Sequence, residues 1–384
     1  MSEDQANMTI QKVFRAVGED TTILGRPQAW AYSSGKFRKS YTIEFHPSST
    51  CAYSCQHCQG LPFNESWGKK PPKMSIDLVD RFFNAYDLRP DKTLGMWRII
   101  ISGMTGEPLL NSDVVNLLTE QAKNRGIAVG LSSSGLLLNQ KNMDLLTSNN
   151  NPGDWFNLSL DCPAGKNERF SSLYQGVHGI KAPNALLKVL NNLERLSKVK
   201  SEKGSGLQIN IDWIVSDLCF DAEHIEEDVI ESIKYLNSLE GVSLLRMQLP
   251  FFLHSQIPSL NEKNSSCLAQ VLESIKSGDT IIEGLRSDFL VKLRNNWYTR
   301  KPLINECSAA RDYGVVFGPD GRAYFCPYMA NPDFENAGGL LPDINVENLW
   351  EMIEKIKPID VEGLTRCQMV CIWKNCFIDL GIVK

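Results

Sequence analysis

A regular alternation of strand-like and helix-like segments begins at residue 40 and limits the possible folds of this chain. Short runs rich in β-branched and apolar residues predict strands at residues 40–47, 97–102, 127–132, 156–161, 207–215 and 242–248. Segments with helical periodicity lie between them, at residues 74–87, 112–124, 140–147, 184–198 and 222–239. Strands that alternate with longer helices form right-handed βαβ units. The sequence therefore predicts an α/β fold with a parallel sheet, either an open doubly wound sheet or a full or partial barrel.

Composition narrows the classes of function. The 384 residues are 42% hydrophobic and 22% charged, as in ordinary folded proteins, with a formal net charge of -5. That charge argues against a broad basic surface, so we expect no nucleic-acid partner. Residues 1–13 contain no apolar signal region, and no later stretch approaches 18 uninterrupted apolar residues. We therefore expect no membrane partner and a cytoplasmic location.

The chain has 11 cysteines, an odd number without a secretory signal, which favours metal ligation or redox chemistry over a disulfide framework. One group lies near the start and another in the last eighty residues, so two metal sites are predicted. The first group is Cys51, Cys55 and Cys58, and the second is Cys307, Cys326, Cys367, Cys371 and Cys376; Cys162, Cys219 and Cys267 are scattered between them.

The first group has the spacing C-x3-C-x2-C and directly follows a predicted strand. Three thiolates at this spacing can bind three corners of a [4Fe-4S] cluster and leave one iron without a protein ligand. A metal with an open coordination position is suited to binding a reactant. A zinc site, or three unrelated thiols, is the alternative interpretation.

The segment CAYSCQHC, at residues 51–58, resembles the signature of the radical S-adenosylmethionine (SAM) superfamily, whose fold is a partial (β/α)6 barrel. In that family SAM chelates the open iron through its amino and carboxylate groups. An electron from the cluster then cleaves SAM to a 5'-deoxyadenosyl radical, which abstracts hydrogen from the substrate. The resemblance implies an electron donor such as flavodoxin or ferredoxin. His57 occupies the position of the family's aromatic residue and would contact the cofactor, unless it is an exposed loop side chain.

A second resemblance follows the second predicted strand. Thr105, Gly106, Glu107 and Pro108 are similar to the family's GGEP segment, which binds the amino group of SAM, with threonine in place of the first glycine. A carboxylate opposite an ammonium group is favourable, and the glycine permits close approach. The alternative is that Glu107 only stabilises a helix N-terminus.

Further cofactor contacts are implied where the family binds SAM, at the carboxyl ends of the third and fourth strands. The candidates are Ser132, Ser134, Ser159, Asp161 and Arg169. Ordinary helix caps and a surface charge are the alternatives. Cys162 and Cys219 also follow strands and are candidate hydrogen-atom donors to a substrate radical, although lone cysteines are usually small buried hydrophobes.

The C-terminal cysteines are similar to those of the SPASM/twitch extension of radical SAM enzymes. A Pro-Asp-Gly turn at residues 319–321 predicts a hairpin that brings Cys307 and Cys326 together. Five cysteines suffice for one auxiliary [4Fe-4S] cluster, held by these two and by two of Cys367, Cys371 and Cys376. A zinc ribbon is the alternative.

The resemblance and the segment pattern together predict four regions. They are an N-terminal extension at residues 1–39, the barrel at 40–255, a helical bridging segment at 256–305 and a SPASM/twitch domain at 306–384.

The resemblance implies a radical SAM oxidoreductase that abstracts hydrogen from a small polar metabolite, with the auxiliary cluster anchoring substrate or accepting its electron. The alternative is a maturase of ribosomal peptides or of proteins such as sulfatases. The 39 residues before the first strand leave no room for a leader-binding winged-helix domain, which favours the small substrate. A non-enzymatic iron-sulfur electron carrier is a third class, but it would not need the Gly106–Glu107 motif.

Overall fold

The structure is a computed structural model. It describes residues 37–55, 57–58, 66–103, 106–148, 151, 153–221, 223–248, 261–275, 306–312, 314–337 and 339–360.

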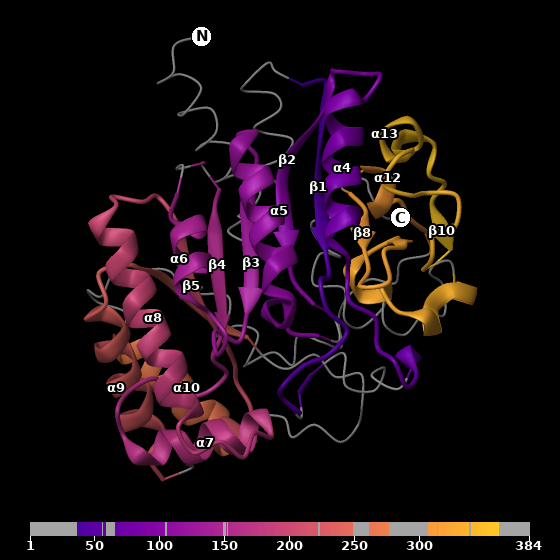
Figure 1. Cartoon of the computed structure of the whole chain (residues 1–384). Helices are drawn as coiled ribbons and strands as arrows, with labels where there is room; N and C mark the ends of the chain where they lie inside the picture. The colour runs from indigo at the N-terminus through magenta and orange to yellow at the C-terminus, as the bar shows by residue number, and fades with distance from the viewer. Residues whose placement is uncertain are drawn as a thin grey trace.

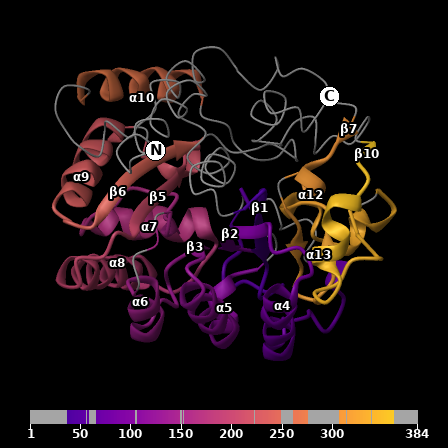
Figure 2. The same ribbon diagram turned by 90° about the horizontal axis from the view of Figure 1, so that it is seen from above.

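Six parallel strands form the centre of the described part of the chain, each hydrogen-bonded to the next in sequence order. They are β1 (Lys39–Phe45), β2 (Leu94–Ile101), β3 (Ala128–Ser133), β4 (Trp155–Ser159), β5 (Gln208–Ile214) and β6 (Val242–Gln248). Seen from above, most helices of this unit lie along one face of the sheet (Figures 1 and 2). The prediction of a partial (β/α)6 barrel is confirmed.

The helices of this unit are α4 (Ile76–Leu88), α5 (Ser112–Asn124), α6 (Gln140–Leu146), α7 (Glu168–His178), α8 (Ala185–Glu202), α9 (Ile225–Asn237) and α10 (Glu262–Ile275), with short 3-10 turns η2 (Pro108–Asn111) and η3 (Asp217–Cys219). The five predicted helices are present. Helix α7 was not predicted, so the connection from β4 to β5 contains two helices. Its signals are the cap Asn167, whose side chain accepts from the Arg169 amide, and Gly179 at its end.

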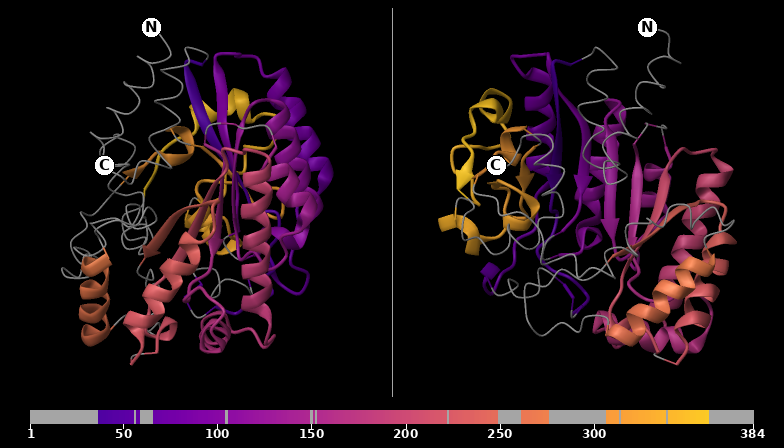
Figure 3. Two further views of the ribbon diagram at one scale, coloured as in Figure 1. Left: turned by 90° about the vertical axis from the view of Figure 1, so that its left-hand side faces the viewer. Right: turned by 180° about the vertical axis from the view of Figure 1, so that it is seen from behind.

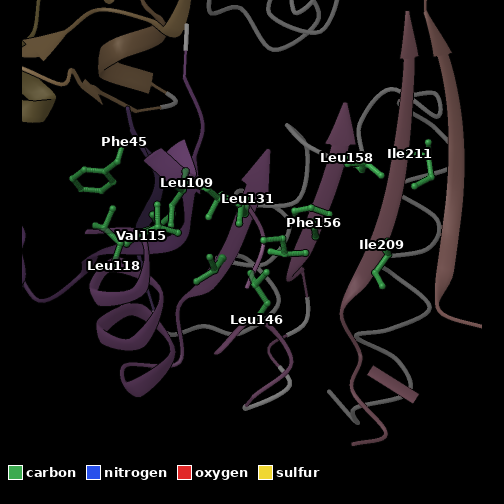
Figure 4. Close-up of a cluster of buried hydrophobic side chains, with 14 of the residues drawn as sticks. Phe45, Leu109, Val115, Leu118, Leu131, Leu146, Phe156, Leu158, Ile209 and Ile211 are labelled. Atoms are coloured by element: carbon green, nitrogen blue, oxygen red, sulfur yellow. The ribbon is translucent and has the colours of Figure 1, made fainter. Parts of the chain in front are cut away.

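The hydrophobic core lies between the sheet and these helices (Figure 4). Successive strand residues point to opposite faces of a sheet. Tyr41, Ile43 and Phe45 of β1 are therefore on one face, where the Phe45 ring meets the Phe82 ring of α4 at 5.0 Å. The other face, which forms the inside of the partial barrel, is polar in β4 and β5. On that face the Asn210 amide donates to Asn157 Oδ1 over 2.9 Å.

A buried ion pair ties α5 to the segment before β4. The Lys123 ammonium group donates to Asp154 Oδ2 at 2.9 Å and to the carbonyls of Leu146 and Ser148 at 2.7 and 2.5 Å. The other carboxylate oxygen of Asp154 accepts the Val129 amide at 2.7 Å. Every donor of the ammonium group is thus used, and α5, α6, β3 and β4 are joined at one point.

Replacing Lys123 with methionine, which has a similar volume, is expected to lower the free energy of unfolding by about 3–5 kcal/mol, because the Asp154 carboxylate stays buried without its cation. Urea unfolding of the purified chain measures the loss. Arg81→Met is the control, since Arg81 pairs with Asp77 and Glu347 at the surface and such pairs contribute about 1 kcal/mol or less each. Equal losses in the two variants would contradict the assignment.

The C-terminal segment extends the same sheet. Its elements are β7 (Glu306–Cys307), α12 (Ala309–Asp312), β8 (Val316–Phe317), β9 (Ala323–Tyr324), η5 (Pro327–Met329), η6 (Pro332–Ala337), α13 (Leu349–Met352), η7 (Ile353–Lys355) and β10 (Ile359–Asp360). Strand β8 pairs in parallel with β1, and β9 pairs antiparallel with β8. The predicted hairpin is therefore present, and it lies beside the first barrel strand (Figure 3).

The predicted region boundaries at 255 and 305 lie outside the described residues, so the division into regions remains a prediction. Helix α10 falls within the predicted helical bridging segment. None of the helices in the described ranges combines the length and apolarity needed to cross a bilayer.

Candidate functional site

The loops that carry the predicted motifs meet at one edge of the sheet, because all six barrel strands run in the same direction. The cysteine loop follows β1, the Gly106–Glu107 loop follows β2, Ser134 follows β3 and Asp161 follows β4. Parallel folds bind ligands at this carboxyl edge.

Gly106 allows the second loop to dock on the first. A Cβ atom at this position would lie 2.0 Å from the Ser48 carbonyl oxygen and 3.0 Å from the Thr50 nitrogen. The Glu107 amide also donates to the Thr50 carbonyl at 2.8 Å. Any side chain at Gly106 would separate the two loops, so glycine is required for their contact.

The Glu107 carboxylate is buried and held in one orientation. Its Oε1 accepts the Ser133 hydroxyl at 2.7 Å and the Leu109 amide at 3.1 Å, and its Oε2 accepts the Ser134 amide at 2.9 Å. No basic side chain in the described part of the chain forms a salt bridge with it. The Leu109 contact caps η2, as the alternative interpretation expected. The two serine contacts are additional, and they leave a fixed negative charge suited to a cationic ligand.

His57 and Asp161 were predicted separately, and the structure brings them into contact. Asp161 has φ of 55°, and its carboxylate accepts the Ile214 amide at 2.8 Å while Oδ2 lies 3.0 Å from His57 Nε2. Burial alone would raise the pKa of Asp161, but the His57 ring and these hydrogen bonds hold that pKa below its ordinary value. His57 Nδ1 is buried and has no hydrogen-bond partner among the described residues. This orphaned nitrogen is available to a ligand.

The three cysteines of the first loop are thiols outside any disulfide. Cys51 is exposed, whereas Cys55 and Cys58 are half-buried. The Tyr53 amide points to the Cys51 sulfur at 3.4 Å, and the Cys58 amide donates to the Cys55 carbonyl at 3.0 Å. Desolvation and the nearby Glu107 carboxylate raise the pKa of Cys51 to about 11, so a bound cation would favour the thiolate there.

Within the described ranges, no three His, Cys, Asp or Glu side chains converge on a position for one metal ion. The three thiols of the first loop could each bind a different iron of a cubane and leave the fourth iron without a protein ligand. The donor set of the first loop therefore fits a [4Fe-4S] cluster.

Sequence reasoning missed two contacts of this loop with α7. The Cys55 sulfur lies 3.0 Å from Nδ1 of His178, at the end of α7, and the Tyr53 hydroxyl lies 2.9 Å from that of Tyr174 on the same helix. Tyr174 and His178 are four residues apart and therefore share a helix face. That spacing is the signal that could have found them, had α7 been predicted.

The remaining candidates differ in their surroundings. Ser132 and Ser159 are half-buried near the carboxyl ends of β3 and β4. Arg169 forms an ion pair with Asp228 of α9, and the Asp228 side chain is fully buried.

The thiols of Cys162 and Cys219 are buried and donate to the carbonyls of Pro163 and Ile214, at 3.3 and 2.9 Å. Burial raises the pKa of Cys219 to about 12. Such thiols resemble packed core cysteines, and their role as hydrogen donors remains a prediction.

In the second group, Cys307 and Cys326 are half-buried thiols packed against the core. Cys307 lies in β7, opposite Ile359 of β10, and Cys326 follows β9. Cys367, Cys371 and Cys376 lie outside the described residues.

Comparison with solved structures finds several with the same fold. SuiB from Streptococcus suis matches with a TM-score of 0.51 and 14% identity, covering 86% of this chain and 72% of SuiB. SuiB bound to the precursor peptide SuiA matches at 0.52 and 12%, with coverages of 86% and 71%. Native anSMEcpe with bound AdoMet matches at 0.52 and 17%, with coverages of 83% and 81%. At these identities the likeness establishes a shared fold. Neither a protein-family model nor a curated protein matches the sequence.

Proposed function

We propose that this chain is a radical SAM enzyme that modifies a peptide or protein substrate. The observation that carries the proposal is the meeting of the cysteine loop with the Gly106–Glu107 loop, through a contact that only glycine permits. An iron-sulfur electron carrier would have no use for a fixed, unpaired carboxylate beside its cluster.

One comparison supports a peptide over the small polar metabolite that the sequence suggested, because this chain shares its fold with SuiB, which has been solved with a precursor peptide. The fold shared with anSMEcpe, which has been solved with AdoMet, supports SAM as the cofactor. The expectation of a small substrate was based on the short segment before β1, and no residue of the described site favours it.

Each residue of the site has a proposed role in binding the cluster or SAM. Cys51, Cys55 and Cys58 would hold a [4Fe-4S] cluster through three of its irons. The cluster and SAM together supply a carbon-centred radical that abstracts hydrogen. Glu107 would bind the SAM ammonium group, with Ser133 and the Ser134 amide fixing the carboxylate. His57, oriented by Asp161, would offer its buried Nδ1 as a hydrogen-bonding group.

The inner face of the sheet suits a polar substrate. Asn157 and Ser159 of β4 and Asn210 of β5 are directed to this face by strand alternation. Such groups can hydrogen-bond the amides of an extended peptide. Ser132 of β3 lies opposite Asn157 in the register of the two strands.

The second group of cysteines would hold one auxiliary [4Fe-4S] cluster. Strand β10 ends at Asp360, opposite Glu306 and next to the register position of Cys307. A seven-residue segment reaches about 25 Å at most, so Cys367 is within chain reach of Cys307. This supports Cys307, Cys326 and two of Cys367, Cys371 and Cys376 as one ligand set.

The proposed activity is tested with anaerobically reconstituted, chemically reduced protein. Formation of 5'-deoxyadenosine from SAM is expected, and its absence would overturn the proposal. The substrate class is tested by expressing the chain together with short open reading frames adjacent to its gene. A change in peptide mass that requires Cys51 supports the peptide substrate; turnover of a small metabolite alone contradicts it.

Replacing Glu107 by glutamine is expected to weaken SAM binding by about 1–3 kcal/mol, or roughly five- to 150-fold in Kd, because a charge-assisted contact to an ammonium group becomes neutral. Anaerobic titration with SAM measures the change, and cluster content should stay the same. Asp113→Asn is the control, since Asp113 is an exposed carboxylate in the first turn of α5. Similar effects in both variants would mean that Glu107 acts only as a helix cap.

A further inference from the structure

The C-terminal end of α7 contacts the backbone of the cysteine loop. The Ser54 amide donates to the His178 carbonyl at 2.9 Å. The next residue, Gly179, has φ of 59°, and a Cβ atom there would lie 2.7 Å from the Ser54 carbonyl oxygen. The loop backbone therefore sits directly on the last turn of the helix, one residue before Cys55.

The His178 side chain continues this contact to the Cys55 sulfur. The imidazole is 1% exposed and packs between two tyrosines, with ring centroids 5.0 Å from Tyr53 and 4.2 Å from Tyr174. Its Nε2 lies 2.9 Å from the Leu160 carbonyl, which can only accept, so Nε2 carries a proton. The ring is thereby fixed in rotation as well as in position. Its other nitrogen, Nδ1, lies 3.0 Å from the Cys55 sulfur.

We propose that His178 is a positioning residue for Cys55. The His178 imidazole sets the direction of the Cys55 thiol before iron binds. The inference rests on the proposed function, because it takes Cys55 as a cluster ligand. Outer groups that orient metal ligands typically change metal retention by about 10- to 100-fold when removed. His178 orients Cys55 through Nδ1 and is itself anchored to β4 through the Leu160 carbonyl.

Two substitutions separate these two contacts. In His178→Asn the side-chain amide occupies the region of Nδ1, so the contact with Cys55 is kept and the tie to Leu160 is lost. In His178→Gln the amide reaches the region of Nε2, so the tie to Leu160 is kept and the contact with Cys55 is lost. A role confined to stability predicts that the asparagine variant is the more damaged. Positioning of Cys55 predicts that the glutamine variant is the more damaged.

The experiment follows the N-terminal cluster by the part of the reduced EPR spectrum that changes when SAM is added. Under challenge with an iron chelator, this signal is expected to disappear at least about tenfold faster in His178→Gln than in wild type, while His178→Asn stays within about threefold. Thermal melting of the iron-free proteins reports stability independently. His224→Gln is the control, since His224 lies at the surface next to Asp221.

Equal rates of signal loss in wild type and His178→Gln would overturn the inference, and so would faster loss in the asparagine variant. The proposed function fails in a different way: wild-type protein would then show no signal that responds to SAM, whatever the residue at position 178.

Discussion

Protein in which Cys51, Cys55 and Cys58 are all replaced by alanine is expected to form no 5'-deoxyadenosine, and to hold about four irons per chain where wild type holds about eight. The three thiolates are the predicted ligands of the cluster that cleaves SAM, so their loss removes that activity altogether. The remaining iron would be that of the proposed auxiliary cluster. Iron and sulfide analysis after anaerobic reconstitution, with chromatography of the nucleoside product, measures both effects.

The control for this prediction is Cys267→Ala. Cys267 is a half-buried thiol on α10, outside both groups, and its loss should change neither iron content nor SAM cleavage. Wild-type protein that saturates near four irons, or that binds stoichiometric zinc, would show that the C-terminal cysteines have been wrongly assigned. Nucleoside formation by the triple variant would overturn the assignment of the first group.

The second large effect is expected at the auxiliary cluster. Cys307→Ala should abolish modification of the substrate and leave some reductive cleavage of SAM, because the cluster at Cys51, Cys55 and Cys58 is untouched. Such uncoupling is expected if the auxiliary cluster anchors the substrate or accepts its electron. Product mass and 5'-deoxyadenosine are measured in the same reaction, and Cys326→Ala should give the same result.

Misfolding must be separated from uncoupling, because a metal that joins a small cysteine-rich segment also contributes folding energy. Each variant is therefore required to stay soluble and to retain the SAM-responsive EPR signal of its first cluster. Full product formation by a variant that has lost its second cluster would show that this cluster is dispensable for the reaction.

Local patterns predicted the barrel well, because its strands have at least one apolar face and its helices are amphipathic. The observed bounds of α5 and β6 match the predicted ranges at both ends. Helix α7 was missed because it contains Gly176, which weakens the helical pattern. The position of the cysteine loop on that helix could not be foreseen for the same reason.

The candidate site was predictable only where a motif is contiguous in sequence. Residues 51–58 and 105–108 could be recognised in this way, but the contact between His57 and Asp161 joins positions 104 residues apart. It also depends on a positive φ at Asp161, which no local preference for this residue type guarantees. The partner of Cys307 is likewise distant: its opposite residue in the β7–β10 ladder is Ile359.

The pairing of β8 with β1 has a consequence for biosynthesis. Strand β1 is translated before β2 to β6, whereas its neighbour β8 is translated after them. Until then β1 has a free edge that can pair with other chains. The loop of Cys51 begins a few residues beyond this strand. A nascent or truncated chain that lacks residues 316–317 would therefore lack the strand that pairs with β1, next to the predicted iron ligands. We therefore expect iron to be loaded after these residues have been translated.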